Sequence, residues 1–169
     1  LYTAGHVQGK APQPKAGEKT QFQAKPRRRP SRAPEIVGED VIYCLNANTG
    51  KEIWTFKYPA VPGKFKGTRA TPVISGGKLY FVSRAGETFC LDAAKGTKLW
   101  SVPAKKVRAE PAGFGASSSA LLHNGLCIVN LGRVVAFDAQ TGRVKWYTRT
   151  EYTKGYNTPR MITIGTKEM

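Results

Sequence analysis

The sequence has few of the side chains from which metal sites and catalytic sites are most often built. Its 169 residues include two histidines and three cysteines, with no CxxC pair and no His-x-x-x-His pair. Those spacings are the usual mark of a zinc site, so none is predicted. We also find no catalytic constellation. We therefore expect no catalytic, cofactor-binding or metal-binding residue in this chain.

Long apolar runs and acidic residues are scarce as well. No stretch approaches the roughly 18 apolar residues of a membrane-spanning helix. Lysine and arginine number 27 against 11 acids, which gives a formal net charge of +16. Because a hard cation such as calcium needs several oxygen ligands, the shortage of acids argues against a site of that kind.

What the sequence does contain is one segment that occurs three times, as Cys44–Trp54, Cys90–Trp100 and Ala136–Trp146. The tryptophans that end the three copies are each separated by 46 residues. A fixed period of this length indicates a repeat architecture.

One repeat unit predicts four short antiparallel strands joined by tight turns. The expected strands are 71–75, 78–83, 87–92 and 98–102 in the middle unit, and 117–122, 125–130, 133–138 and 144–148 in the next. Gly76-Gly77 and Asn124-Gly125 are two-residue hairpin turns. Four such strands every 46 residues match a propeller blade. The expected fold is all-β, a β-propeller of which about three blades are present.

The repeated segment has a mechanical interpretation. A polar residue precedes the turn in each copy: Asn46, Asp92 and Asp138. We expect its side chain to accept hydrogen bonds from backbone N–H groups about two residues further along the chain. The glycines that end the turn in the left-handed conformation are Gly50, Gly96 and Gly142. Each copy ends in a tryptophan: Trp54, Trp100 and Trp146. We expect each ring to dock on the neighbouring blade and its indole N–H to donate to a polar partner. The functional alternative, a tryptophan stacked on a planar cofactor, needs a ring that faces the propeller axis, whereas these lie on the outermost strand.

The cysteines and histidines have structural interpretations too. Cys44 and Cys90 hold the same place in neighbouring units. Equivalent positions one blade apart lie beyond the roughly 7 Å limit for a disulfide, so we expect these two and Cys127 to be small buried apolar residues. His123 precedes a hairpin turn and is expected in solvent, and His6 is expected at the mouth of an insertion.

The motif Ala/Cys-Leu-Asp-Ala-x-Thr-Gly-Lys-x-x-Trp resembles the tryptophan-docking repeat of the pyrroloquinoline-quinone-like (PQQ repeat) β-propellers, over residues 1–5 and about 39–169. Asn46 in the first copy and Lys95 in the second depart from it, and both are tolerable in a turn. The family includes bacterial quinoprotein alcohol dehydrogenases and a propeller lipoprotein of the outer-membrane assembly machine. The resemblance implies the fold and a bacterial, extracytoplasmic setting, periplasmic or associated with the outer membrane. It leaves the activity open.

The resemblance also sets the expected domain plan, in which residues 1–169 are part of one propeller. The blades are expected at about 1–58, 70–103 and 117–149, with the start of another at 156–169. Leu1–Gly5 aligns with a second strand, so we expect a fragment that begins and ends within a blade, with the remaining blades of the same protein as partners.

The first unit carries an insertion at about residues 6–38, where the second unit joins its middle strands with the three residues 84–86. It is rich in Pro, Lys, Arg and Gln, with eight Lys or Arg and two acids. Such a segment cannot bury enough apolar surface to offset its ordering entropy, so we expect a disordered loop with polyproline character.

Strand direction predicts that loops joining the second and third strands share a face with the loops that join blades. The cations expected on this basic face are Arg27, Arg28, Arg29, Arg32, Lys64, Lys66, Arg69, Arg84, Lys105, Lys106, Arg108, Arg133 and Lys154, with Tyr58, Phe65, Tyr152 and Tyr156 nearby. Such a face suits nucleic acid, anionic lipid or an acidic protein. Alternatively, it keeps the protein soluble or balances an acidic remainder of the protein.

Three functions are compatible with the sequence. The favoured one is a non-enzymatic scaffold that binds proteins through loops or blade edges, without a cofactor. The first alternative is a fragment of a PQQ-dependent quinoprotein dehydrogenase, which would bring PQQ and calcium. The adjacent Cys-Cys pair common in the alcohol dehydrogenases is absent. The second alternative is polyanion or nucleic-acid binding through the insertion, although no specific nucleic acid is predicted.

Overall fold

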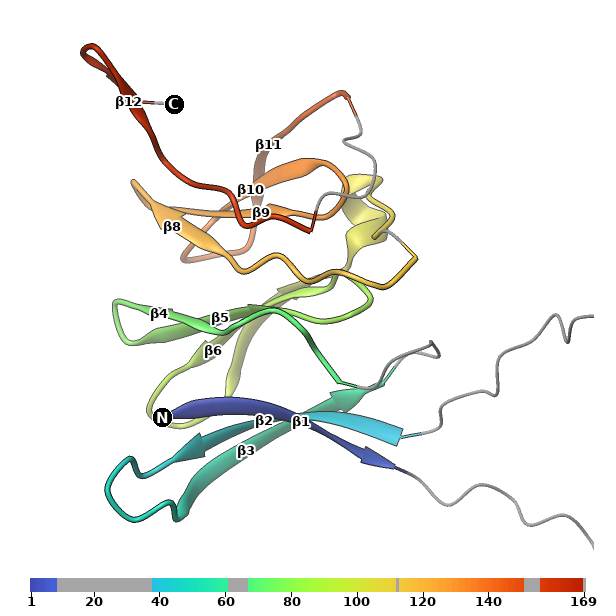
Figure 1. The fold of residues 1–169 in the computed structure, drawn as a ribbon, viewed down its shortest axis with the longest axis vertical. Coiled ribbons are helices and arrows are strands. Elements are labelled where there is room, and N and C mark those ends of the chain that lie inside the picture. Colours follow the sequence, from blue (N-terminus) through green and yellow to red (C-terminus); the bar gives the residue numbers. More distant parts are fainter. Residues whose placement is uncertain (9–37, 61–66, 112, 151–155, 169) are drawn as a thin grey trace, which may run out of the picture.

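The computed structural model describes residues 1–8, 38–60, 67–111, 113–150 and 156–168. Within these ranges the chain forms antiparallel β-sheets that follow one another along the stack (Figure 1). A short 3-10 helix, η1 (Ala104–Val107), follows the second sheet. The predicted all-β fold class is confirmed.

Each sheet is built from strands that are consecutive in sequence. The first has the order β1-β2-β3, with β1 Tyr2–Gln8, β2 Gly38–Leu45 and β3 Glu52–Pro59. The second has the order β4-β5-β6-β7, with β4 Val73–Ser75, β5 Lys78–Val82, β6 Thr88–Asp92 and β7 Lys98–Val102. The third has the order β11-β10-β9-β8, with β8 Leu121–His123, β9 Leu126–Asn130, β10 Val134–Asp138 and β11 Val144–Tyr147. A two-stranded sheet holds β12 Thr163–Ile164 and β13 Lys167–Glu168.

The first strand of each later sheet is shorter than the sequence predicts. β4 begins at Val73 rather than Thr71, and the intervening Pro72 has no N–H to donate to a ladder. β8 begins at Leu121 rather than Ser117, because the N–H of Ser119 donates to Thr158 Oγ1, 3.1 Å away, instead of to β9. In the blade start expected at 156–169, the first strand is likewise short, with only the two residues of β12.

In the first sheet the strands are longer than expected. β1 continues to Gln8 and β2 begins at Gly38, with His6 opposite Asp40 and Gln8 opposite Gly38. Residues 6–8 and Gly38, which the sequence analysis assigned to the insertion at about 6–38, therefore belong to the antiparallel pair β1–β2. Residues 9–37, which hold nearly all of that insertion, lie outside the described residues, so its expected disorder stays a prediction.

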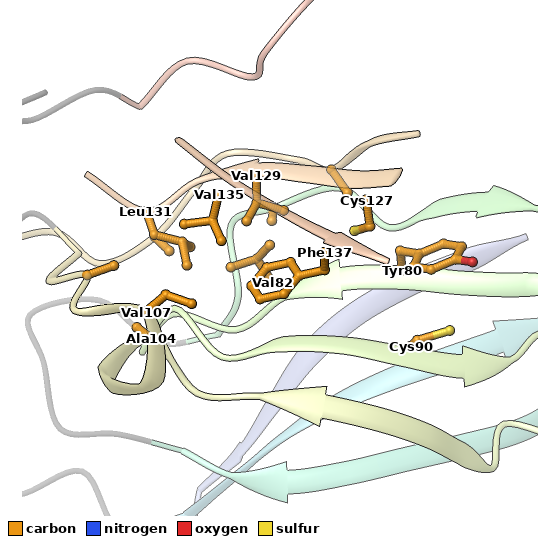
Figure 2. Packing of buried hydrophobic residues seen from close by; sticks show 14 of the residues in the cluster. Tyr80, Val82, Cys90, Ala104, Val107, Cys127, Val129, Leu131, Val135 and Phe137 are labelled. Carbon is orange, nitrogen blue, oxygen red and sulfur yellow. The ribbon is translucent and has the colours of Figure 1, made fainter. Parts of the chain in front are cut away.

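Two apolar layers separate the three larger sheets. Between the first and second sheets, the rings of Phe81 and Phe89 stack with centroids 4.8 Å apart, and Tyr58 of β3 packs against both. Between the second and third, the buried residues include Val82, Cys127, Val129, Val135 and Phe137 (Figure 2). Each large apolar side chain buried in this way contributes about 1.5–3 kcal/mol, so the junctions between sheets hold the stack together.

Candidate functional site

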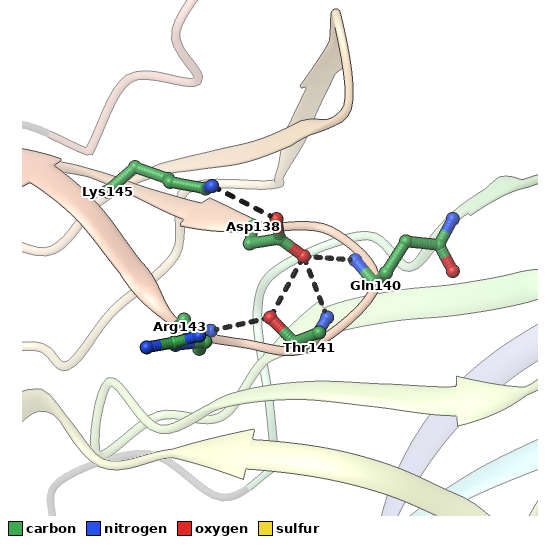
Figure 3. A network of polar contacts seen from close by, with 5 residues as sticks. All are labelled: Asp138, Gln140, Thr141, Arg143 and Lys145. Atoms are coloured by element: carbon green, nitrogen blue, oxygen red, sulfur yellow. Dashed lines mark hydrogen bonds and ion pairs between the residues drawn. The ribbon is translucent and has the colours of Figure 1, made fainter.

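In each of the three larger sheets, the turn between the last two strands is closed by the polar residue that precedes it. Asp138 Oδ1 accepts the N–H groups of Gln140 at 3.1 Å and Thr141 at 3.0 Å, and the Thr141 hydroxyl at 2.9 Å (Figure 3). Lys145 Nζ lies 3.3 Å from Asp138 Oδ2. The hydrogen bond from the Thr141 hydroxyl, followed by that from its N–H, lowers the pKa of Asp138.

The other two turns have the same geometry, as the sequence predicts. Asp92 Oδ1 accepts the N–H groups of Ala94 and Lys95, each at 2.9 Å. Asn46 Oδ1 accepts those of Asn48 and Thr49 at 2.9 and 3.0 Å. These polar side chains are therefore engaged in turn formation.

The turns of the second and third sheets each receive a tryptophan from the preceding sheet. Trp54 Nε1 donates to the carbonyl oxygen of Ala93 at 3.1 Å, and Trp100 Nε1 donates to that of Ala139 at 3.2 Å. A tyrosine hydroxyl from the preceding sheet donates to the same carbonyl, Tyr2 to Ala93 and Tyr80 to Ala139, each at 3.1 Å. Each docking junction thus joins two side-chain donors to one backbone acceptor.

Glycine makes room for the docked ring. A Cβ at Gly142 would lie 2.7 Å from Trp100 Cδ2, and one at Gly96 would lie 2.6 Å from Trp54 Cδ2. Trp146 differs from the other two tryptophans, because it is 44% exposed. The first turn differs in the complementary way, because a Cβ at Gly50 would meet nothing within 4 Å.

The cysteines are buried and free, as expected. Burial raises the pKa of the Cys90 thiol to about 11 and that of Cys127 to about 12. Because the thiolate is the reactive form, these groups are chemically inert near neutral pH.

His123 is not in open solvent, contrary to the expectation from its place beside a hairpin turn. It lies on β8, with Nε2 2.7 Å from Asn124 Nδ2 and 3.1 Å from Glu168 Oε2 on β13. The β12–β13 hairpin reaches it from a distant part of the sequence, which sequence proximity cannot show. His6 lies on β1, and its side chain is outside the described part of the structure.

Among the described residues, the basic face has fewer exposed members than predicted. Arg84 and Arg133 are buried, at 6% and 7% exposure, and so is Tyr58. The loop at Gly115 closes over Arg84, since a Cβ at this glycine would meet Arg84 Cγ at 2.4 Å. The guanidinium of Arg133 lies 5.3 Å from the ring centroid of Tyr147.

Among the described cations of this face, those that reach solvent are Arg69, Lys105, Lys106 and Arg108, with Tyr156 also exposed. The predicted members outside the described residues are Arg27, Arg28, Arg29, Arg32, Lys64, Phe65, Lys66, Tyr152 and Lys154. The exposed described cations of the face therefore centre on η1 and its C-cap, Arg108.

Sequence reasoning missed a hydroxyl ladder that links the sheets near their first strands. The N–H of Thr71 donates to Ser119 Oγ at 3.0 Å, and the N–H of Ser119 donates to Thr158 Oγ1 at 3.1 Å. Thr71, Ser119 and Thr158 hold equivalent positions in successive sheets. The sequence marks two of these positions by a Thr-Pro dipeptide, Thr71-Pro72 and Thr158-Pro159. Ser119-Ala120 stands in the same place without the proline.

Two further findings concern ligand chemistry. Within the described ranges, no group of three or more His, Cys, Asp or Glu is placed to hold a metal ion. A cavity of about 190 Å³ lies where the second and third sheets meet, and its polar lining includes Tyr80, His123, Asn124 and Gln140.

In the described part of the chain no helix is long and apolar enough to cross a membrane.

A second feature that sequence reasoning missed is an apolar rim on the last strand of each of the three larger sheets. Ile53 on β3 and Leu99 on β7 hold the same place before the tryptophan and are 59% and 48% exposed. Val144 and Tyr147 on β11 are each 41% exposed. Because β3, β7 and β11 are edge strands, this apolar rim lies beside unpaired backbone groups.

Comparison with known proteins gives one family, and its relatives include quinone alcohol dehydrogenase subunits and an assembly factor. The chain matches the family model described as outer membrane protein assembly factor BamB over residues 15–160. The dehydrogenase subunit of the quinone alcohol dehydrogenase from Komagataeibacter europaeus is 29% identical over 119 residues, which is 60% of this chain and 16% of the relative. Outer membrane protein assembly factor BamB from Moranella endobia is 27% identical over 121 residues, which is 66% of this chain and 29% of the relative.

The fold is also that of a solved structure with a TM-score above 0.5. Quinohemoprotein alcohol dehydrogenase from Comamonas testosteroni has a TM-score of 0.51 at 20% identity, over 68% of this chain and 19% of that chain. BamB from Moraxella catarrhalis has a TM-score of 0.47 at 24% identity, over 68% of this chain and 33% of that chain. The chain thus spans 16% and 29% of the two curated relatives. It belongs to the family of outer membrane protein assembly factor BamB, among the PQQ-like β-propellers.

Proposed function

We propose that this chain is part of a non-enzymatic propeller scaffold that binds protein partners along the edges of its blades. The observation that carries the proposal is the apolar rim, defined by Ile53, Leu99, Val144 and Tyr147. Ile53 and Leu99 hold the same position on their edge strands, where β11 has Lys145, and β11 exposes Val144 and Tyr147 at other positions. A repeated apolar surface beside free backbone groups fits an extended protein segment of alternating apolar and polar residues.

The physical basis is strand addition. An edge strand presents unpaired N–H and C=O groups, which give affinity to any extended segment, and side chains beside it give selectivity. The name of one family relative, outer membrane protein assembly factor, supports a role in handling other proteins. The same name supports the proposal that the chain works outside the cytoplasm, in the periplasm or at the outer membrane.

The experiment measures binding of a fluorescent peptide of alternating valine and threonine to the 169-residue chain by anisotropy. We expect saturable binding that a backbone N-methylated peptide loses, because N-methylation removes the donors of strand pairing. Ile53→Lys and Leu99→Lys should each weaken binding by about tenfold or more. Ile74→Lys is the matched control, since Ile74 is an exposed apolar residue, at 47%, on the opposite edge strand β4. Equal binding of the N-methylated peptide would contradict edge pairing.

The dehydrogenase alternative rests on the relatives that are quinone alcohol dehydrogenase subunits. Its cofactor set needs a calcium-type ion with several oxygen ligands. Asp92 and Asp138 are engaged by turns, and the described residues bring no three potential ligands together. These residues do not fit such a site, and we derive no catalytic step through one. Alcohol-dependent dye reduction after addition of quinone and calcium would restore this alternative.

The polyanion alternative, which the sequence assigns to the insertion at about 6–38, is joined by a second basic surface among the described residues, the exposed cations Lys105, Lys106 and Arg108 around η1. Binding through these charges should fall steeply with salt, because counterions are released on binding. A Lys105→Glu/Lys106→Glu variant should lose heparin affinity if this surface is used. Unchanged affinity would exclude it.

A further inference from the structure

The hairpin between β8 and β9 places an asparagine directly before a glycine in an exposed turn. Asn124 and Gly125 are both exposed, and both are left-handed, with φ of +45° and +74°. This backbone is that of a type I′ turn, for which Asn-Gly is well suited. No other asparagine in the sequence precedes a glycine.

The peptide nitrogen of Gly125 is open to attack by its neighbour's chemistry, because nothing shields it. A Cβ at Gly125 would meet nothing within 4 Å. Within the described residues its N–H donates no hydrogen bond, whereas its carbonyl accepts the N–H of Ala139 at 2.9 Å. The glycine is therefore held in place while its nitrogen stays free to react with the Asn124 side chain.

The side-chain nitrogen of Asn124 has an imidazole beside it. His123 Nε2 lies 2.7 Å from Asn124 Nδ2. General acid catalysis needs a heavy-atom distance of about 2.6–3.2 Å, which this pair satisfies. A protonated ring is thus placed to donate Nε2–H to the amide nitrogen when that nitrogen leaves as ammonia.

We propose that Asn124 is a self-modification site, at which the asparagine converts to aspartate or isoaspartate without the help of another protein. The Gly125 nitrogen loses its proton to solvent and attacks Asn124 Cγ, which forms a cyclic imide. The Cγ–Nδ2 bond breaks as His123 protonates Nδ2, so ammonia leaves. Water then adds to either imide carbonyl, and the C–N bond that breaks decides between aspartate and isoaspartate.

The other asparagines are less well placed for this reaction. Asn46 Oδ1 accepts two backbone N–H groups, and Asn130 Oδ1 accepts that of Gly132 at 3.1 Å, so both amides are held in turns. The residues that follow Asn46, Asn48, Asn130 and Asn157 are Ala, Thr, Leu and Thr, whose side chains crowd the attacking nitrogen. These four asparagines are controls within the same chain.

The product changes what holds the β12–β13 hairpin. Glu168 Oε2 on β13 lies 3.1 Å from His123 Nε2, the same atom that Asn124 contacts. A carboxylate at residue 124 would place a second negative charge beside that atom, and the two carboxylates repel each other. Aspartate still suits the type I′ turn, whereas isoaspartate lengthens the backbone by one methylene. Modification therefore weakens the contact between the hairpin and the third sheet.

The first test incubates the folded 169-residue chain at neutral pH and follows loss of each asparagine amide by peptide mass spectrometry. We expect loss at Asn124 to be faster than at Asn48, and His123→Gln to slow it by about tenfold or more. In urea, wild type and His123→Gln should lose the amide at one rate, because the contact exists only in the folded chain. Loss at Asn124 no faster than at Asn48, or equal rates for the two folded chains, would overturn the proposal.

The second test uses Asn124→Asp as a stable form of one product. Amide hydrogen exchange in residues 163–168 should be about threefold faster than in wild type, as expected for loss of a surface ion pair. Asn124→Gly is the matched control, because glycine keeps the left-handed turn without adding a carboxylate. Equal exchange in Asn124→Asp and Asn124→Gly would show that modification does not loosen the hairpin.

Discussion

Gly96 lies so close to Trp54 that a Cβ at this glycine would stand 2.6 Å from the indole atoms Cδ2 and Cε3. Gly50 has the same φ of +69°, yet a Cβ there would meet nothing within 4 Å. The two glycines therefore separate the cost of a left-handed backbone from the cost of crowding a docked ring.

Gly96→Ala should lower the free energy of unfolding by about 2–4 kcal/mol, because the left-handed conformation disfavours any Cβ and the new methyl displaces the ring of Trp54. Gly50→Ala should cost only the backbone part, about 1–2 kcal/mol. Urea unfolding of both variants at one dilute concentration measures the difference. Equal losses would show that the ring of Trp54 does not depend on the space at Gly96.

The shared carbonyl of Ala139 predicts a non-additive mutant cycle. Tyr80→Phe and Trp100→Phe each remove one of its two side-chain donors, and each should cost about 0.5–1.5 kcal/mol. The double variant should cost more than the sum, because the carbonyl then loses both side-chain donors. Urea unfolding of the four chains gives the coupling energy. Trp146→Phe is the control and should leave the free energy of unfolding nearly unchanged.

The docking turns could be predicted from sequence because their chemistry is local. Asp138, Thr141 and Gly142 lie within one turn, and their identities alone imply the hydrogen bonds and the positive φ that the structure has. Arg84 and Arg133 were misplaced because exposure depends on what packs over a side chain.

Contacts between residues far apart in sequence were missed because they too depend on how the sheets pack. The contact of His123 with Glu168 spans 45 residues, and the hydrogen bond from Thr71 to Ser119 spans 48. Serine and threonine carry no periodic signal that would mark such a contact. The sequence therefore predicted the repeated unit, while the contacts between units needed the structure.

Thr88 offers a prediction in the stabilising direction. Its side chain is fully buried, and Oγ1 makes no hydrogen bond within the described part of the chain. Thr88→Val removes an unsatisfied buried hydroxyl at nearly constant volume, so the free energy of unfolding should rise by about 1 kcal/mol. Thr68→Val is the control with the opposite sign, because Thr68 Oγ1 donates to the carbonyl of Val82 at 2.7 Å. A loss of stability in Thr88→Val would mean that the hydroxyl has a partner.

The turn at Asp138 predicts a dependence on pH. Its pKa is lower in the folded chain than in the unfolded chain, so the carboxylate stabilises the fold above the unfolded pKa of about 4. That contribution is lost as the pH falls through the folded pKa. Asp138→Asn should therefore be less stable than wild type at pH 7, and the difference should shrink below about pH 4.

Asn46 shows that an asparagine can close the same turn, with two backbone N–H groups at 2.9 and 3.0 Å, so the Asp138→Asn variant should fold. The reverse change, Asn46→Asp, is the matched test and should gain stability at pH 7 relative to pH 3, because a charged acceptor forms stronger hydrogen bonds. Thermal unfolding of the three chains at both pH values measures the two differences. A gap between wild type and Asp138→Asn that stays constant from pH 7 to pH 3 would show that the charge of Asp138 does not stabilise the turn, and that the shape of its acceptor alone is enough.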